Sequence, residues 1–217
     1  MSRLWLRRSK RGIYLYCREM LRLLRWQQEV LQNQVPTIFL MWVCSVVLTY
    51  PERGLVNATF GIVFMYFWVY FVHRSLHLLP NWATTHMSFH HAAADAKPLP
   101  RWLELVFETA TDAGMNLALL VVQWIMGYQL VHPLIIVFFT LTYMSAHIIN
   151  YSIFGSETHR LHHTELNKNF GPDTIDHIVG TNFDESFEDM TPIMFNAACS
   201  FVIIGYIKDV LCLGQPV

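Results

Sequence analysis

The sequence predicts an all-α integral membrane protein with four transmembrane helices and a histidine-rich, metal-binding cap on the cytosolic side. Of its 217 residues, 53% are hydrophobic and only 14% are charged, a balance typical of membrane proteins. Several apolar runs approach the roughly 20 residues that a helix needs to cross a bilayer. Two dense histidine clusters, within residues 73–91 and 159–163, directly follow such runs.

The chain begins with a strongly basic segment, because eight of its fifteen Lys and Arg lie in the first 25 residues. Such a segment can bind nucleic acid, but beside so much apolar chain it favours a cytosolic flank that contacts anionic lipid. Apolar residues over 14–31 have roughly helical spacing, which fits an interfacial amphipathic helix or a solvated tail. We therefore divide the chain into this segment, 1–34, and a membrane-embedded domain, 35–217, and expect no nucleic-acid partner.

Four apolar runs are the predicted spans, and turn residues such as Pro51 and Gly54 separate them. We interpret residues 98–113 as an interfacial helix, because acidic residues interrupt its apolar positions. The run 191–207 fits either a fifth span or a helix lying flat, and the sequence leaves this open. The predicted spans are residues 35–50, 54–72, 114–131 and 133–154.

The positive-inside rule orients these spans. With the basic N-terminus in the cytosol, residues 73–113 and 155–190 also face the cytosol, so both histidine clusters lie on one side of the membrane. His132 falls on the opposite side and is excluded as a partner of the clusters.

The histidines have the spacing of metal ligands. His73 and His77 are four residues apart, as are His86 and His90, so each pair faces one way on a helix. Eight clustered imidazoles exceed the four that one tetrahedral zinc uses, which favours two ions. His147 lies inside the fourth span, where an ionisable residue is functional by default. The predicted metal ligands are His73, His77, His86, His90, His91, His147, His159, His162 and His163.

Imidazole ligands suit zinc, iron, copper or nickel alike. The carboxylates Glu157, Asp173 and Asp176 are candidates for orienting the ligands through hydrogen bonds, and Tyr151 is a further neighbour of the site. Whether His177 binds metal stays open. The four cysteines are far apart and form no CxxC pair, which argues against a disulfide framework or a thiolate zinc site.

The motifs HRSLH, HMSFHH and HRLHH, followed by NFGP and DHIVGT, resemble the fatty acid hydroxylase / sterol desaturase superfamily over roughly residues 56–182. The resemblance implies a catalytic domain of the endoplasmic reticulum membrane. It also implies two iron ions, with zinc as an alternative metal, held by the nine histidines above. Such enzymes use O2 and an external electron donor. Three features depart from the common pattern: the middle box has an extra residue, Tyr151 replaces a histidine, and His177 stands where a basic residue is frequent.

The expected function is therefore an O2-dependent di-iron oxygenase that hydroxylates or desaturates a lipid such as a fatty acyl chain, a sterol or an isoprenoid. Electrons are expected from a separate cytochrome b5 or reductase. Aromatic residues of the second span either line a cavity for the lipid or face the bilayer; they are Phe64, Tyr66, Phe67, Trp68 and Phe71. The alternatives are a membrane protein that binds or transports metal, and a non-catalytic member of the family.

Overall fold

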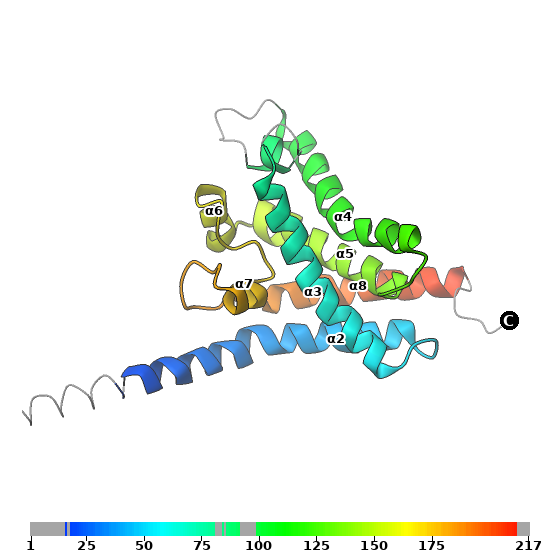
Figure 1. Ribbon diagram of the computed structural model, residues 1–217, viewed down its shortest axis with the longest axis horizontal. Helices are drawn as coiled ribbons and strands as arrows, with labels where there is room; N and C mark the ends of the chain where they lie inside the picture. Colours follow the sequence, from blue (N-terminus) through cyan, green and yellow to red (C-terminus); the bar gives the residue numbers. More distant parts are fainter. Residues whose placement is uncertain (1–15, 17, 81–83, 85, 92–98, 212–217) are drawn as a thin grey trace, which may run out of the picture.

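The computed structural model describes residues 16, 18–80, 84, 86–91 and 99–211, and every regular element within them is helical. Figure 1 shows a bundle of long helices with the short helices α6 and α7 at one end. In chain order the elements are η1 (Val30–Gln34), α2 (Val35–Thr49), α3 (Leu55–Leu78), η3 (His86–His90), α4 (Arg101–Met126), α5 (Pro133–Ser145), η4 (Ala146–Ile153), α6 (Glu157–Thr164), α7 (Asp173–Val179) and α8 (Thr191–Val210).

The described residues contain five helices that are long and apolar enough to cross a membrane, where the sequence predicted four spans. The additional one is α8, the run whose placement the sequence left open. Lys208 near its end donates to the backbone carbonyl of Leu48 at 2.9 Å, which links α8 to α2. The five are Arg18–Thr49, Leu55–Leu78, Arg101–Met126, Pro133–Ile153 and Thr191–Val210.

Two predicted boundaries lie inside continuous helices. One helix runs from Arg18 to Thr49 and includes the π-helical turn η1, so it crosses the division predicted at residues 34 and 35. The predicted interfacial helix 98–113 and span 114–131 form the single helix α4, and the prediction of separate elements was wrong. Its acidic residues Glu104, Glu108 and Asp112 are buried instead of facing water. The basic residues before Tyr16 lie outside the described residues.

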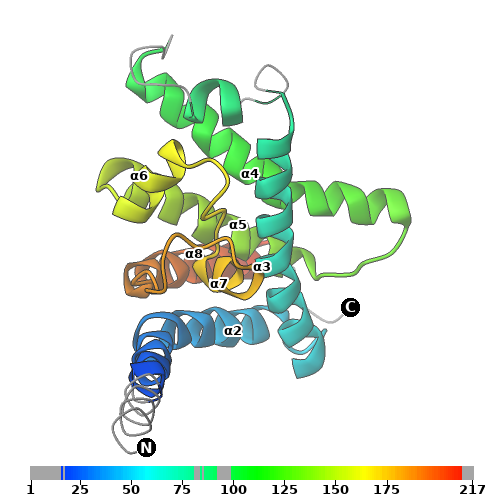
Figure 2. The same ribbon diagram turned by 60° about the vertical axis from the view of Figure 1, so that its left-hand side comes forward.

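The long helices run in alternating directions, so two sets of loops meet at opposite ends of the bundle. At one end, Arg53 donates to Gln129 at 3.0 Å, and His132 contacts Glu52 at 3.1 Å. At the other end, α3 and η4 lead into the histidine-bearing segments. Figure 2 shows α7 beside α3, with α6 further to the left in this second view. Both histidine clusters therefore share one end, and His132 lies at the other, as predicted.

Helices α2, α3, α5 and α8 pack around a common core that includes Met65, Tyr70 and Phe138, each fully buried. Gly61 lets α3 approach α5 closely, because a Cβ atom there would lie 2.9 Å from Cδ1 of Ile135. Pro133 occupies the first turn of α5, where its missing N–H costs no hydrogen bond.

The close approach at Gly61 gives a first prediction. Gly61→Leu should lower the thermal unfolding temperature of the detergent-solubilised protein, because overpacking a tight contact costs typically about 1–3 kcal/mol. Gly61→Ala should have a smaller effect, since the Ile135 methyl group at the contact can rotate away. Gly54→Ala, at a position with no atom within 4 Å of a Cβ, is the control. Equal unfolding temperatures for all three variants would contradict the close packing of α3 on α5.

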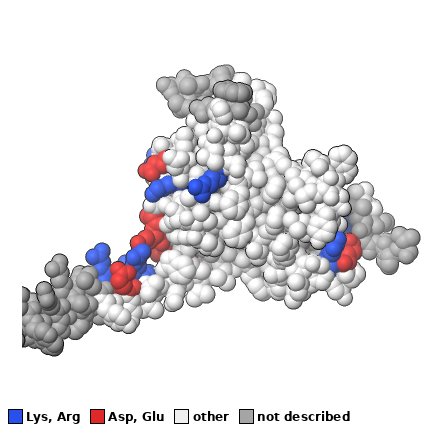
Figure 3. All heavy atoms as spheres, in the orientation of Figure 1, with Lys and Arg blue, Asp and Glu red and all other residues white. Residues whose placement is uncertain are grey.

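The outer surface is apolar over broad areas. In the view of Figure 3, acidic and basic residues gather on the left and at one small patch on the right, and white surface separates them. Large side chains such as Trp124 and Phe195 are exposed on α4 and α8, with 81% and 75% of their areas accessible. Contiguous apolar exposure on this scale suits contact with lipid.

Candidate metal centre

Nine histidines predicted as metal ligands converge at one end of the bundle. They come from four places: the last turns of α3, the turn η3 with the residue after it, the π-helical stretch η4, and α6. Ser156 caps α6 by accepting from the backbone N–H of His159 at 3.3 Å, which fixes where this eight-residue helix begins. Their side chains fall into two neighbouring groups.

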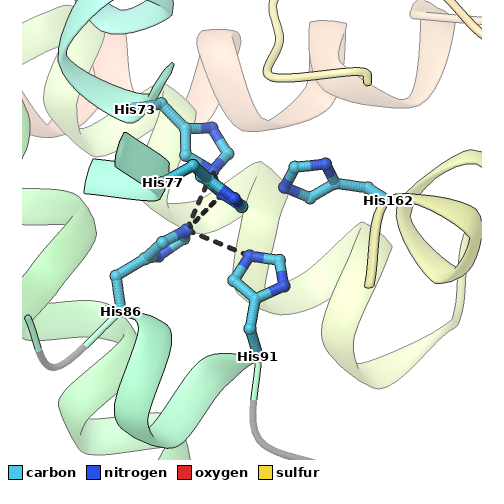
Figure 4. Close-up of side chains that lie close together, drawn as sticks. All are labelled: His73, His77, His86, His91 and His162. Carbon is cyan, nitrogen blue, oxygen red and sulfur yellow. Dashed lines mark hydrogen bonds between the residues drawn. The ribbon is translucent and has the colours of Figure 1, made fainter. Parts of the chain in front are cut away.

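The first group comprises five imidazoles whose potential ligand atoms all lie within 4.8 Å of one another: His73, His77, His86, His91 and His162. Figure 4 shows these rings pointing toward a common centre from three separate parts of the chain. The Nε2 atom of His86 lies 2.9 Å from Nε2 of His73 and 3.1 Å from Nε2 of both His77 and His91.

These nitrogen contacts fit a cation better than hydrogen bonds. Nδ1 of His73 lies 2.5 Å from the Phe170 carbonyl oxygen, and a neutral imidazole has only one N–H, so its Nε2 presents a lone pair to the group. Nε2 of His86 has at most one hydrogen for three nitrogen neighbours. Nitrogens that bind one ion at about 2.1 Å are separated by roughly 3.0–3.4 Å. The spacing of this group therefore suits a shared metal ion.

The second group contains His90, His147, His159 and the carboxylate of Glu108, again with potential ligand atoms within 4.8 Å of one another. Nε2 of His163 lies 3.0 Å from Nε2 of His159, which places the ninth histidine beside this group. Nε2 of His90 and of His147 are buried without a hydrogen-bond partner. Buried polar atoms are normally paired, so these two also suit a bound cation.

The imidazoles outside the spanning helices favour the neutral form that binds metal. Burial, followed by neighbouring imidazoles, lowers the pKa of His86 and His90 well below the ordinary histidine value. Burial also lowers the pKa of His162 to about 4, although the Lys168 carbonyl opposes the shift. At neutral pH these rings are uncharged and offer a nitrogen lone pair.

Two carboxylates at the site were not predicted. Glu108 and Asp112 of α4 are buried, and Oδ2 of Asp112 lies 2.9 Å from Nδ1 of His147. The sequence carried a usable signal, because Glu104, Glu108 and Asp112 recur every four residues and share one helix face. We interpreted this stretch as an interfacial helix, and therefore expected the acidic face to contact water.

The three predicted orienting carboxylates lie elsewhere. Glu157 pairs with Arg160 on the surface. Asp173 accepts from Gln34 Nε2 at 3.2 Å and from the backbone N–H of Glu188 at 3.0 Å. Asp176 accepts from the backbone N–H groups of Phe170 and Gly171 and from the Thr181 hydroxyl. Asp176 thereby holds the turn whose Phe170 carbonyl contacts His73. It can therefore orient His73 only indirectly, through the backbone of this turn.

The remaining candidates lie at the edge of the site or outside it. His177 stacks on Phe187, with ring centroids 3.7 Å apart, and its Nε2 contacts the Ser186 carbonyl, so it belongs to neither group. Tyr151 stacks on His159 at 5.4 Å and donates to Glu188 at 3.2 Å. Tyr151 is therefore adjacent to the second group, as expected.

A pocket of about 90 Å³ touches both groups. Apolar and aromatic side chains of α3 and α5 line one part, among them Tyr66, Phe139 and Tyr143. His73 and His162 of the first group and His147 and His159 of the second line another part. Of the five aromatic residues considered for a cavity, Tyr66 is the one among its lining residues. Phe64, Phe67 and Trp68 are partly buried against the core, and Phe71 is 55% exposed.

Together the fold and the two groups define a helical membrane protein with a histidine-rich site suited to metal ions. Residues 58–181, more than half of the chain, match the sequence profile of the fatty acid hydroxylase family. The chain belongs to this family, which confirms the resemblance seen in its histidine motifs. Neither the curated proteins nor the solved structures compared with the chain gave a match.

Proposed function

We propose that this protein is a di-iron oxygenase that hydroxylates or desaturates a lipid chain in the endoplasmic reticulum membrane, with its metal centre facing the cytosol. The observation that carries the proposal is the pocket, whose lining joins buried aromatic side chains to histidines of both groups. Membership in the fatty acid hydroxylase family supports a lipid substrate and an oxidoreductase activity.

Five imidazoles of the first group would hold one iron, and His90, His147, His159 and His163 would hold the other. When bound, the iron pair supplies O2 activation and removal of hydrogen from an unactivated C–H bond. The nine histidines would fix the separation of the two ions. Zinc would fit the same donors but lacks redox chemistry.

The apolar part of the pocket would hold the lipid. Tyr66 and Phe139 pack edge to face, with ring centroids 5.4 Å apart, and give the pocket a rigid wall. Tyr143, between them and His147, continues this wall toward the second group. These side chains would exclude water and place one segment of the chain beside the histidines.

A reconstitution experiment tests the proposal. The full chain in nanodiscs, supplied with iron, NADH, cytochrome b5 and its reductase, should convert a lipid in an O2-dependent reaction. Under ¹⁸O2, mass spectrometry of the products separates the two outcomes: hydroxylation places the label in the lipid, and desaturation gives an unlabelled double bond.

Acyl, sterol and isoprenoid substrates should be tested in parallel, with iron-free protein as the control. Lack of conversion of every lipid, together with metal crossing of sealed proteoliposomes, would contradict the proposal and favour transport. Tight binding of two irons without lipid oxidation or metal transport would instead indicate a non-catalytic member of the family.

A further inference from the structure

We infer that Glu108 and Asp112 are positioning residues for the second metal ion. Their carboxylates lie against Nδ1 of His90 and His147 and so turn the Nε2 atom of each ring toward the ion. The inference rests on the proposed function, because it requires metal at the second group.

The two contacts have the same design. Oδ2 of Asp112 is 2.9 Å from Nδ1 of His147, and Oε1 of Glu108 contacts Nδ1 of His90. In both rings the opposite nitrogen, Nε2, is buried and without a hydrogen-bond partner. A metal-binding imidazole commonly donates its other N–H to a carboxylate, which fixes the ring and makes the bound nitrogen more basic.

The burial of Glu108 and Asp112 is best explained by a role at the metal site. Asp112 is 1% exposed and Glu108 6%, and burying a carboxylate without compensation is costly. The Ser152 hydroxyl donates to Oε1 of Glu108 at 2.9 Å, while the half-exposed Arg101 lies 4.0 Å from Oε2. Ser152 and His147 both belong to η4. This one π-helical stretch therefore supplies both a histidine of the second group and the hydroxyl that donates to Glu108.

The first group is built differently. Nδ1 of His73 contacts the Phe170 carbonyl and Nδ1 of His162 the Lys168 carbonyl, each at 2.5 Å. These acceptors are neutral, whereas those of the second group are anionic. Two nearby negative charges and more basic imidazoles favour a cation. The second group should therefore bind a divalent ion more tightly than it would if its histidines contacted neutral acceptors.

One distance admits a competing role for Glu108. Its Oε1 atom also lies 3.9 Å from Nε2 of His147, close enough for a single ion between them at about 2.1 Å from each. Direct ligation by Glu108 and positioning by Glu108 predict different metal contents after its removal.

The experiment measures metal binding by the full-length protein in nanodiscs. Metal-free wild type and the variants D112A, D112N, E108A and E108Q are titrated with Co²⁺ against a competing chelator, with visible absorption reporting each site. The control is N116A, which alters a buried polar residue one turn further along α4. A parallel series loaded with ⁵⁷Fe reports the environment of each iron by Mössbauer spectroscopy.

All variants should still bind two ions at saturation. In D112A and E108A the affinity of the second site should fall about 10–100-fold, as measured when such hydrogen-bond partners are removed. Asparagine and glutamine should restore part of the loss, because an amide oxygen still accepts the Nδ1 hydrogen. One of the two iron signals should change in these variants, and N116A should match wild type.

Two results would overturn the inference. Complete loss of the second ion in E108A, with D112A still binding two, would make Glu108 a ligand. Unchanged affinity and iron signals in all four variants would reduce both acids to a structural role. The proposed function can fail separately from this inference. If the wild type binds two ions and the variants behave as expected, but no lipid is oxidised, the oxygenase proposal is contradicted and the positioning role is supported.

Discussion

Replacing His162 with alanine should reduce lipid oxidation to background and remove the ion of the first group. His162 is 1% exposed, and its ring centroid lies 5.1 Å from that of His73, 4.8 Å from that of His77 and 4.8 Å from that of His91. Its Nδ1 contacts the Lys168 carbonyl, which leaves a buried, unpartnered Nε2 facing the group. Loss of a side chain that only orients a ligand already costs about 10–100-fold, so loss of a ligand should cost more.

Membrane insertion should survive this change, because His162 lies outside the five long helices. The measurements are iron content per chain, product formation and the elution profile of the detergent-solubilised protein. His132→Ala is the matched control, since this histidine lies at the opposite end of the bundle and contacts Glu52. Wild-type activity in H162A would contradict the assignment of the first group.

Asp176→Ala should have the second large effect, on stability and metal content together. The Asp176 side chain is fully buried and accepts from the backbone N–H groups of Phe170 and Gly171 and from the Thr181 hydroxyl. Each buried donor left without a partner costs about 1–3 kcal/mol, so the summed loss should exceed about 3 kcal/mol. The Phe170 carbonyl would then lose its fixed position against His73.

The expected result is a lower unfolding temperature and weaker metal binding at the first group. Asp176→Asn is the matched variant, because it keeps one acceptor oxygen of the same shape, and its loss should be intermediate. Thr181→Val, which removes only the hydroxyl donor, should have the mildest effect of the three. Wild-type stability and metal content in D176A would contradict the role assigned to this turn.

The sequence was sufficient to predict the convergence of the nine histidines. Their spacing places pairs on common helix faces, and alternating spans put both clusters at one end. It could not decide between a span and a flat helix for residues 191–207; the structure extends this run to the helix Thr191–Val210, which is long and apolar enough to cross a membrane. Asp112 and Glu108 were missed for a related reason: acids among apolar residues fit a water-facing helix equally well until their histidine partners are located.

The division of the nine rings between two groups also needed the structure. His90 and His91 are adjacent in sequence yet belong to different groups. The π-helical turn η3 ends at His90, and π-helical turns carry no clear pattern in a sequence.

Helix α6 supplies His162 to one group and His159 to the other from eight consecutive residues. Both rings are therefore attached to one short helix, so a tilt or slide of α6 would disturb both groups at once.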